Sequence, residues 1–158
     1  AAFRRYGQIV GVGREPSLVN NGTALRHDIG NVMKSERSKS ALLLSVFEAE
    51  EQQLPLRVTM LECHPLSAQT IVPMQETRFV VIVCPPTSDN SPDTVGLEAF
   101  LFGPDQGVNI HPGVWHHPIV ALDKKTLFFV QSWQDGSDLD CRIAYIEPIL
   151  LVPGPGIP

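Results

Sequence analysis

Hydrophobic residues over most of the chain fall into short runs separated by proline, glycine, aspartate or asparagine. From residue 56 onward each run is rich in Val, Ile, Phe or Thr and is closed by one of these turn formers, which is typical of β-strands. The predicted strands are Leu56 to Cys63, Gln69 to Val72, Arg78 to Cys84, Leu97 to Phe102, Val108 to Ile110, Trp115 to Leu122, Thr126 to Trp133 and Arg142 to Ile146. This spacing predicts a mainly β sandwich or barrel with few short helices.

The N-terminal third is less regular. Residues Phe3 to Val12 form a short strand candidate, and Asn21-Gly22 predicts a hairpin turn. Residues Ala41 to Glu48 have the length of a strand and contain Val and Phe, although their Ala and Leu residues also suit a helix. The chain therefore predicts a hairpin and one further strand before the regular part begins.

Three segments are predicted to be irregular. Asn31 to Ser40 is polar and basic without a period, and Pro85 to Val95 has the composition of a surface loop. Pro153 to Pro158 (PGPGIP) is unsuited to a strand or a helix. We expect one domain over residues 1–152, followed by a loose tail at 153–158.

The length of 158 residues fits one domain with its own core. With 12 basic and 17 acidic residues the formal charge is −5, so nothing indicates a nucleic-acid partner. The apolar runs at 41–46 and 79–84 are far too short to span a membrane. The cysteines lack CxxC spacing and are odd in number, which argues against disulfides and favours a reducing, cytoplasmic location: Cys63, Cys84 and Cys141.

The segment Gln106 to Pro118, QGVNIHPGVWHHP, holds three of the five histidines within seven positions. Its glycines and prolines exclude a helix and predict a turn followed by short strands. Histidine changes charge near neutral pH and ligates metals, so such a cluster favours a pocket. Because side chains alternate along a strand, we expect only one of His116 and His117 to enter that pocket.

A second polar cluster lies about fifty residues earlier. Glu62 and His64 are two apart and so share one face of a strand, with Gln69 five positions further on. This spacing resembles the first motif of cupins, with Glu62 in the place of the leading histidine. His111-x-Gly113-x-x-His116 resembles the second motif, with His111 in the place of proline. Together they predict a cupin-like double-stranded β-barrel of the jelly-roll type.

These positions form a candidate metal site. Glu62, His64, Gln69 and His116 supply a mixed nitrogen and oxygen set that suits a divalent ion such as Mn, Fe, Ni or Zn. The alternative is that the same residues bind substrate through hydrogen bonds without a metal. Glutamine is a weak ligand and a leading glutamate is atypical, so both alternatives stay open here.

Several segments spread over the chain resemble the ureidoglycolate lyase family. They are FxxYGxxI at 3–9, NNGTALR at 20–26, LExHPL at 61–66, Gln69 with Pro73, 79–83, Leu97 with Ala99 and Phe100, QGVN at 106–109 and GVWHHP at 113–118. The resemblance implies a cupin-like barrel, a homodimer, and a soluble enzyme of purine and allantoin catabolism. Its reaction would split ureidoglycolate into glyoxylate and urea.

Three positions depart from the family pattern. Cys63 stands where arginine is usual, Ile110 where tyrosine is usual, and Gln131-Ser132 where Asp-Arg is usual. Losing an arginine removes a bidentate carboxylate contact. Two alternatives therefore remain: a diverged cupin enzyme acting on another small carboxylate or carbonyl substrate, as an isomerase or metal-assisted lyase, and a cupin that binds a small molecule without turnover.

The chemistry of ureidoglycolate cleavage assigns roles to these residues. A base takes the hydroxyl proton, the C–N bond breaks, and an acid protonates the departing nitrogen. His116 is the predicted base, supported by Glu62 or His64. Strand alternation points Trp115 and Cys63 to the opposite face, so we expect Trp115 in the core or at a dimer contact and no nucleophilic role for Cys63.

The substrate carboxylate needs a positively charged or N–H partner. Arg26, just beyond the Asn-Gly turn, is the predicted contact, with help from Thr23 and Asn21. Arg78 is the second choice, because at a strand start it also suits a solvated edge position. Further predicted substrate-binding residues are Gln69 and His111.

Overall fold

The computed structural model describes residues 2–12, 15–30, 32–35 and 37–154. Short strands dominate, with three single-turn 3-10 helices. The elements are η1 (Ala2–Arg5), β1 (Gly7–Val10), β2 (Ser17–Val19), η2 (Asn20–Gly22), β3 (Ala24–Arg26), β4 (Ala41–Ala49), β5 (Leu56–Cys63), β6 (Gln69–Pro73), β7 (Phe79–Cys84), η3 (Thr94–Gly96), β8 (Glu98–Phe102), β9 (Gly107–Ile110), β10 (Trp115–His116), β11 (Val120–Ala121), β12 (Thr126–Gln134) and β13 (Arg142–Leu151).

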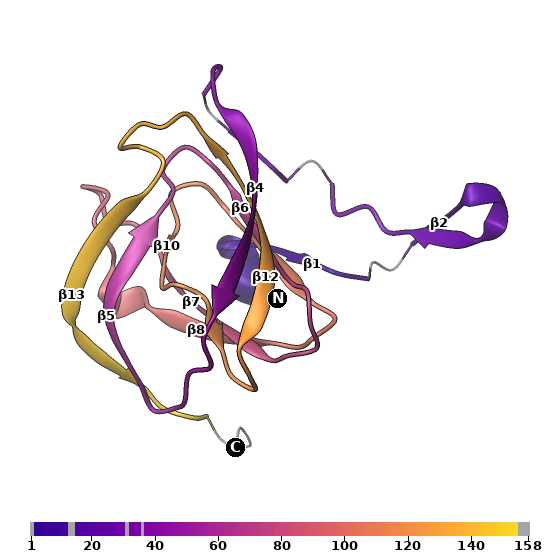
Figure 1. The fold of residues 1–158 in the computed structure, drawn as a ribbon. Helices are drawn as coiled ribbons and strands as arrows, with labels where there is room; N and C mark the ends of the chain where they lie inside the picture. Colours follow the sequence, from indigo (N-terminus) through magenta and orange to yellow (C-terminus); the bar gives the residue numbers. More distant parts are fainter. Residues whose placement is uncertain (1, 13–14, 31, 36, 155–158) are drawn as a thin grey trace.

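Two antiparallel sheets curve around the barrel (Figure 1). One has the order β1-β9-β6-β12-β4, and the other has the order β11-β7-β10-β5-β13, with β8 paired to β7. Within them, β4-β12-β6-β9 and β5-β10-β7-β8 are two sets of four strands between which the chain crosses repeatedly. This is the jelly-roll connectivity of two Greek keys, so the predicted cupin-like double-stranded β-barrel is confirmed.

The barrel is filled from both sheets. Along β12 buried and half-buried residues alternate, so Phe128 and Val130 point inward. Phe79 packs with Phe102 and Phe128 at ring-centroid distances of 5.4 and 5.5 Å. A second apolar cluster, on the other face of β5, β7 and β10, contains Trp115 and Cys63, as strand alternation predicts.

The main differences from the predicted strands have local causes. The strand expected from Trp115 to Leu122 is split into β10 and β11 around Pro118, which has no N–H to donate. Strand β13 is longer than predicted and continues past Pro148 to Leu151. Its register on β5 shifts between Tyr145 and Ile149, and such irregularities on edge strands accommodate proline.

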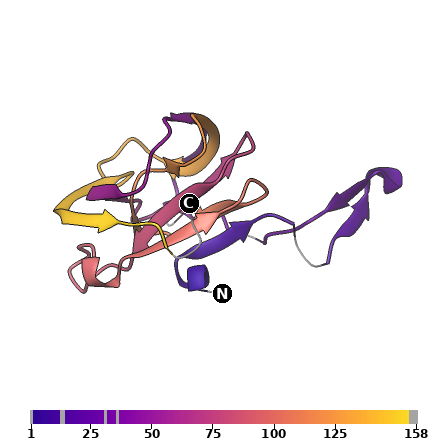
Figure 2. The ribbon, with the colours of Figure 1, turned by 90° about the horizontal axis from the view of Figure 1, so that it is seen from below.

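The predicted hairpin is present but lies away from the barrel. We call β2, η2 and β3, residues 17–26, the hairpin arm; it projects to one side in both views (Figures 1 and 2). Its turn contains three consecutive residues with positive φ: Asn20 (53°), Asn21 (54°) and Gly22 (87°). Asparagine and glycine are the residues that adopt this backbone most readily, so the turn is determined locally.

No helix in the described part of the chain is long and apolar enough to cross a membrane. Pro153 and Gly154 follow β13 without regular structure. The rest of the predicted tail, residues 155–158, lies outside the described residues.

Candidate active site

The polar cluster of the barrel forms where β5 ends beside β10. In the antiparallel register His116 lies directly opposite Glu62, and His64 follows β5 immediately. One ligand atom from each of Glu62, His64 and His116 lies within 4.8 Å of the others. The imidazole rings of His64 and His116 have centroids 5.4 Å apart. The early Glu-x-His pair and the late histidine therefore meet in one cluster.

Backbone carbonyls fix the tautomers of these histidines. A carbonyl oxygen only accepts, so Nδ1 of His64 donates to Asp140 (2.6 Å) and Nδ1 of His116 donates to Val114 (3.0 Å). When the rings are neutral, each Nε2 then carries a lone pair. The Nε2 of His116 is buried, without a hydrogen-bond partner among the described residues, and lies 3.4 Å from a carboxylate oxygen of Glu62. This pair is arranged to hold a proton or a cation between its two atoms.

Glu62 and His116 line a cavity of about 460 Å³, and His64 lies behind them, outside the set of lining residues. Strands from both sheets form the cavity wall, and Gln69 of β6 donates from its amide nitrogen to Nε2 of His64 (2.9 Å). The lining residues are Phe47, Glu48, Ala49, Glu62, Gln69, Ile71, His116, His117, Pro118 and Ile119. This set joins an apolar wall to a few converging polar groups, as in small-molecule sites.

Burial and mutual charge set the ionisation of the cluster. Burial is the main reason why the pKa of His64 is lowered, and the charge of His116 lowers it further. Burial alone would raise the pKa of Glu62, but the adjacent imidazole of His116, with His64 and His117, makes the net shift downward. Near neutral pH the site therefore combines an ionised carboxylate with a neutral His64.

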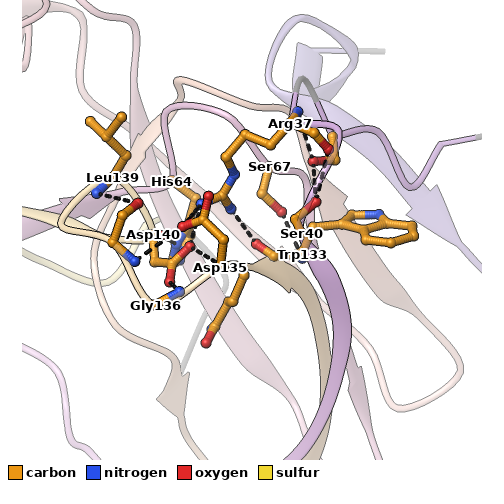
Figure 3. Close-up of polar contacts among 12 residues, drawn as sticks. Arg37, Ser40, His64, Ser67, Trp133, Asp135, Gly136, Leu139 and Asp140 are labelled. Carbon is orange, nitrogen blue, oxygen red and sulfur yellow. Dashed lines mark hydrogen bonds and ion pairs between the residues drawn. The ribbon is translucent and has the colours of Figure 1, made fainter.

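A partly buried polar network holds His64 in position (Figure 3). Arg37, whose side chain is only 9% exposed, pairs with Asp135 (2.8 Å) and Asp140 (2.5 Å) and donates to the carbonyl of Trp133 (2.7 Å). The Asp140 carboxylate also accepts from the backbone N–H of Asp135 and Gly136. The loop is thereby closed, and the Asp140 carbonyl is fixed at His64.

The prediction that only one of His116 and His117 enters the pocket is wrong. Both line the cavity. Strand β10 ends at His116, and the chain before Pro118 no longer has strand geometry, so side-chain alternation does not extend to His117. Nδ1 of His117 donates to the carbonyl of Pro118 (2.8 Å), and burial lowers the pKa of its ring.

Comparison with known protein families identifies the family of this chain. The model of the family described as ureidoglycolate lyase matches residues 1–152. The chain belongs to this family. Among its relatives is the ureidoglycolate lyase of Pseudomonas putida strain GB-1, which is 34% identical over 157 residues, covering 98% of this chain and 92% of the relative. The ureidoglycolate lyase of Pseudomonas aeruginosa strain LESB58 is 35% identical over 156 residues, covering 96% and 90%.

Solved structures with a similar arrangement are more distant. A 3,4-ketoisomerase from Helicobacter canadensis matches with a TM-score of 0.47 and 9% identity, covering 85% of this chain and 88% of that chain. A TDP-quinovose 3,4-ketoisomerase from Campylobacter jejuni matches with a TM-score of 0.44 and 13% identity, covering 88% and 90%.

The positions that depart from the lyase pattern do not all lie near the cavity. Cys63 lies on the opposite face of β5, beside Trp115 and Arg142 in a separate pocket. Ile110 and Ser132 are the cross-strand neighbours of Gln69, one on each side, and both are buried. A hydrophobic side chain and a hydroxyl therefore flank Gln69 where the family pattern has a phenol and a guanidinium.

The structure does not bring the other predicted substrate-binding residues to this cavity within one chain. Arg26 lies on the hairpin arm, 64% exposed and paired with Asp28, and Asn21 and Thr23 occupy the exposed turn of the same arm. Arg78 is engaged by the carboxylate of Asp123 (2.7 Å) at the surface. His111 contacts the side-chain amide of Gln8 and is not part of the lining.

Some structurally important residues were missed by sequence reasoning. Arg37 lies in a segment predicted only as a polar loop, and Asp140 follows a turn-forming run after β12. Phe47 and Glu48 were predicted as part of a strand but not as cavity wall. The one available signal was the Asp-Gly-Ser-Asp sequence at 135–138, which marks a turn but not its partner.

Proposed function

We propose that this protein cleaves ureidoglycolate into glyoxylate and urea; its relatives are named ureidoglycolate lyases. The supporting observation is the convergence of Glu62, His64 and His116 beside the cavity of a chain that belongs to the lyase family, with Glu62 and His116 in the cavity lining. A carbinolamide needs a base close to its hydroxyl and an acid close to its nitrogen, and the cluster offers both within one substrate length.

His116 is the group best placed to move the proton. Its Nε2 has a lone pair, no partner among the described residues, and the Glu62 carboxylate 3.4 Å away. In the proposed reaction Nε2 removes the hydroxyl proton while the carbon–oxygen double bond forms and the C–N bond breaks. The imidazolium, stabilised by Glu62, then returns this proton to the departing urea nitrogen. No water or redox partner is consumed, so the atoms of ureidoglycolate equal those of the two products.

His64 and Gln69 are proposed to orient the substrate. Both ring nitrogens of His64 are engaged, Nδ1 with the Asp140 carbonyl and Nε2 with the Gln69 amide nitrogen, so His64 fixes Gln69. The amide oxygen of Gln69 and its second N–H are then the acceptor and donor for a polar ligand. Phe47, Ile71 and Ile119 supply the apolar part of the cavity wall. Together they would hold the hydroxyl toward His116.

The same residues fit a divalent cation such as Ni, Mn, Fe or Zn. The Nε2 atoms of His64 and His116 and a carboxylate converge, the Nδ1 atoms are oriented by backbone carbonyls, and Nε2 of His116 has no hydrogen-bond partner among the described residues. Glu62, His64 and His116, with Gln69 beside them, would hold the ion. Bound there, it would lower the pKa of a nearby hydroxyl group.

The proposed activity is tested by incubating the untagged protein with ureidoglycolate and measuring glyoxylate and urea, which should appear in equal amounts. His116→Gln should lower turnover by about 10²- to 10⁴-fold, the range expected for removing a general base. His117→Gln is the neighbouring comparison and should have a smaller effect, because Nδ1 of His117 is tied to Pro118 and the ring lies outside the Glu62 and His116 pair. Absence of products at saturating substrate would exclude the proposal.

A second candidate is another reaction on a small carbonyl substrate, such as isomerisation. It is favoured by one observation: the cavity lining contains Glu48 and Glu62 but, among the described residues, no arginine or lysine. Inhibition by glyoxylate and by its uncharged methyl ester separates the candidates. An anion-selective site should bind glyoxylate more tightly, whereas preference for the ester would favour the second candidate.

A cytoplasmic location and a homodimer complete the proposal. All three cysteines are unbridged, and Cys63 and Cys84 are buried, which suits a reducing compartment. The homodimer is supported by the long edge of β4 that no described strand pairs with.

A further inference from the structure

The hairpin arm exposes an apolar pair. Leu18 and Leu25 lie directly opposite each other on β2 and β3, so both side chains point to the same side of the arm. They are 68% and 60% exposed, and the arm extends away from both sheets (Figure 2). An isolated two-stranded hairpin has little stability of its own in water, so this surface is suited to a partner.

Strand β4 is the second uncovered surface. Its nine residues pair with β12 along one edge, and the described strands leave its other edge open. Leu42, Leu44 and Val46 alternate along one face and are 40%, 59% and 56% exposed. A long apolar edge strand of this kind attracts further strands unless it is covered.

Strand β4 also forms part of the cavity wall through Phe47, Glu48 and Ala49. A segment that covers β4 is therefore placed beside the mouth of the cavity. The cavity itself offers an anionic substrate two carboxylates and, among its described lining residues, no positively charged lysine or arginine. A lysine or arginine partner for the substrate carboxylate would therefore have to come from outside this lining.

We propose that a second copy of the chain completes the active site. Its hairpin arm lies along the open edge of β4, where Leu18 and Leu25 continue the apolar face formed by Leu42, Leu44 and Val46. Arg26 is next to Leu25 on β3 and so points to the other face, where it contacts the substrate carboxylate at the cavity mouth. This inference rests on the proposed function, since ureidoglycolate is the anion to be bound. Arg26 can leave Asp28 to make this contact, because the side chains of both residues are exposed and such an ion pair contributes little to stability.

The properties of the arm favour a second copy over an unrelated partner. Two identical chains related by a twofold axis exchange arms reciprocally, so the two exposed apolar surfaces are brought together without any additional molecule. A hairpin also offers backbone N–H and carbonyl groups along its outer edge, which are the partners that the open edge of β4 lacks. The competing arrangement, direct pairing of two β4 strands without the arm, is an outcome that the tests distinguish.

Mixed dimers test the exchange. Arg26→Ala should lower kcat/KM by about 10- to 100-fold, the range for losing a hydrogen-bonded charge contact, and Arg26→Lys should recover part of it. Neither the Arg26→Ala dimer nor the His116→Gln dimer contains an intact site. A purified heterodimer of the two variants contains one intact site, formed by Arg26 of one chain and His116 of the other. It should therefore have about half of the wild-type activity.

The outcomes are distinct. If wild type cleaves ureidoglycolate but the heterodimer stays as inactive as its parents, Arg26 does not act across the dimer and the inference is wrong, while the proposed function stands. If the wild-type protein is inactive, the dimer contact is tested instead by measuring the mass of the protein in solution. Sedimentation equilibrium should give a dimer for wild type and a monomer for Leu18→Asp/Leu25→Asp, with unchanged circular dichroism.

A matched control uses Val95, which is 97% exposed in η3, outside the arm. Val95→Asp introduces the same kind of charge at an exposed apolar position and should leave the dimer intact. A dimer that survives both substitutions in the arm would show that β4 is covered in another way and would overturn the inference.

Discussion

The barrel and the hairpin arm are both built from short antiparallel strands, but only the barrel strands have a second layer. In the barrel, the register of β5 and β10 sets Glu62 against His116, and buried groups on both sides fix the two rings. In the arm, Leu18 and Leu25 are exposed, and no layer formed by the described residues covers them. The barrel thus provides fixed geometry, whereas the arm provides surface for assembly.

The largest expected difference between the two regions is in stability. Phe79→Ala removes a fully buried ring that packs on Phe102 and Phe128, so the free energy of unfolding should fall by about 3–5 kcal/mol. Leu18→Ala should change it by no more than about 0.5 kcal/mol when the protein is dilute enough to be monomeric. Urea unfolding of both variants measures this, and a large effect of Leu18→Ala in the monomer would contradict the comparison.

The next effect concerns the network behind His64. Arg37→Met leaves Asp140 and Asp135 without their shared cation, so we expect a loss of about 1–3 kcal/mol, reduced from the value for a fully buried pair by the partial exposure of both carboxylates. Turnover should fall as well, because the Asp140 carbonyl orients His64. Arg37→Lys should recover part of the stability. Unchanged turnover in a destabilised Arg37→Met protein would show that the network serves stability alone.

Acid pH should destabilise the barrel by less than either of these substitutions does. Burial lowers the pKa of His64 and His117 in the folded protein, so below the ordinary histidine value of about 6.5 the unfolded chain binds more protons than the folded chain. Their contribution is complete above that pH and is lost as the pH falls through the folded-state pKa values. Thermal melts of EDTA-treated protein should show a decreasing Tm toward pH 5, with a flatter profile for His64→Gln. A Tm that rises on acidification would contradict this assignment.

The smallest expected effect is a difference in chemical labelling among the three cysteines, without any change in the stability of the protein. Burial raises the pKa of Cys63 to about 12 and that of Cys84 to about 11, so both stay protonated and inaccessible at pH 8. Cys141 is exposed. Iodoacetamide should therefore add once per chain, at Cys141, as mass spectrometry of the peptides can verify. Rapid modification of Cys63 would mean that the barrel wall opens readily.

The parts of the site that depend on strand alternation were predictable from the sequence. The spacing of Glu62 and His64 places them on one face, and the same rule separates Cys63 and Trp115 from the cavity. The alternation rule failed at His117, because Pro118 ends the strand geometry on which it depends. Local periodicity is thus informative only as far as the strand extends.

Tertiary relations were not available in the same way. The turn at Asn21 and Gly22 is a local signal, but nothing local indicates that the arm leaves the barrel and removes Arg26 from the cavity of its own chain. Arg37 reaches Asp140 over more than a hundred positions, and its neighbours in the sequence form no periodic pattern. Such contacts follow from how the loops close on the sheets, which single-sequence patterns do not record.

The jelly-roll crossing has a kinetic consequence for ligand binding. Glu62 and His116 are separated by more than fifty residues along the chain, and Gln69 reaches them from the opposite sheet, so no early hairpin contains a complete site. Chains dominated by such distant pairings fold slowly, because closing long loops costs entropy before the stabilising contacts have formed. Ligand affinity should therefore appear only at the last stage of refolding, so the rate at which binding is recovered measures the rate of barrel closure.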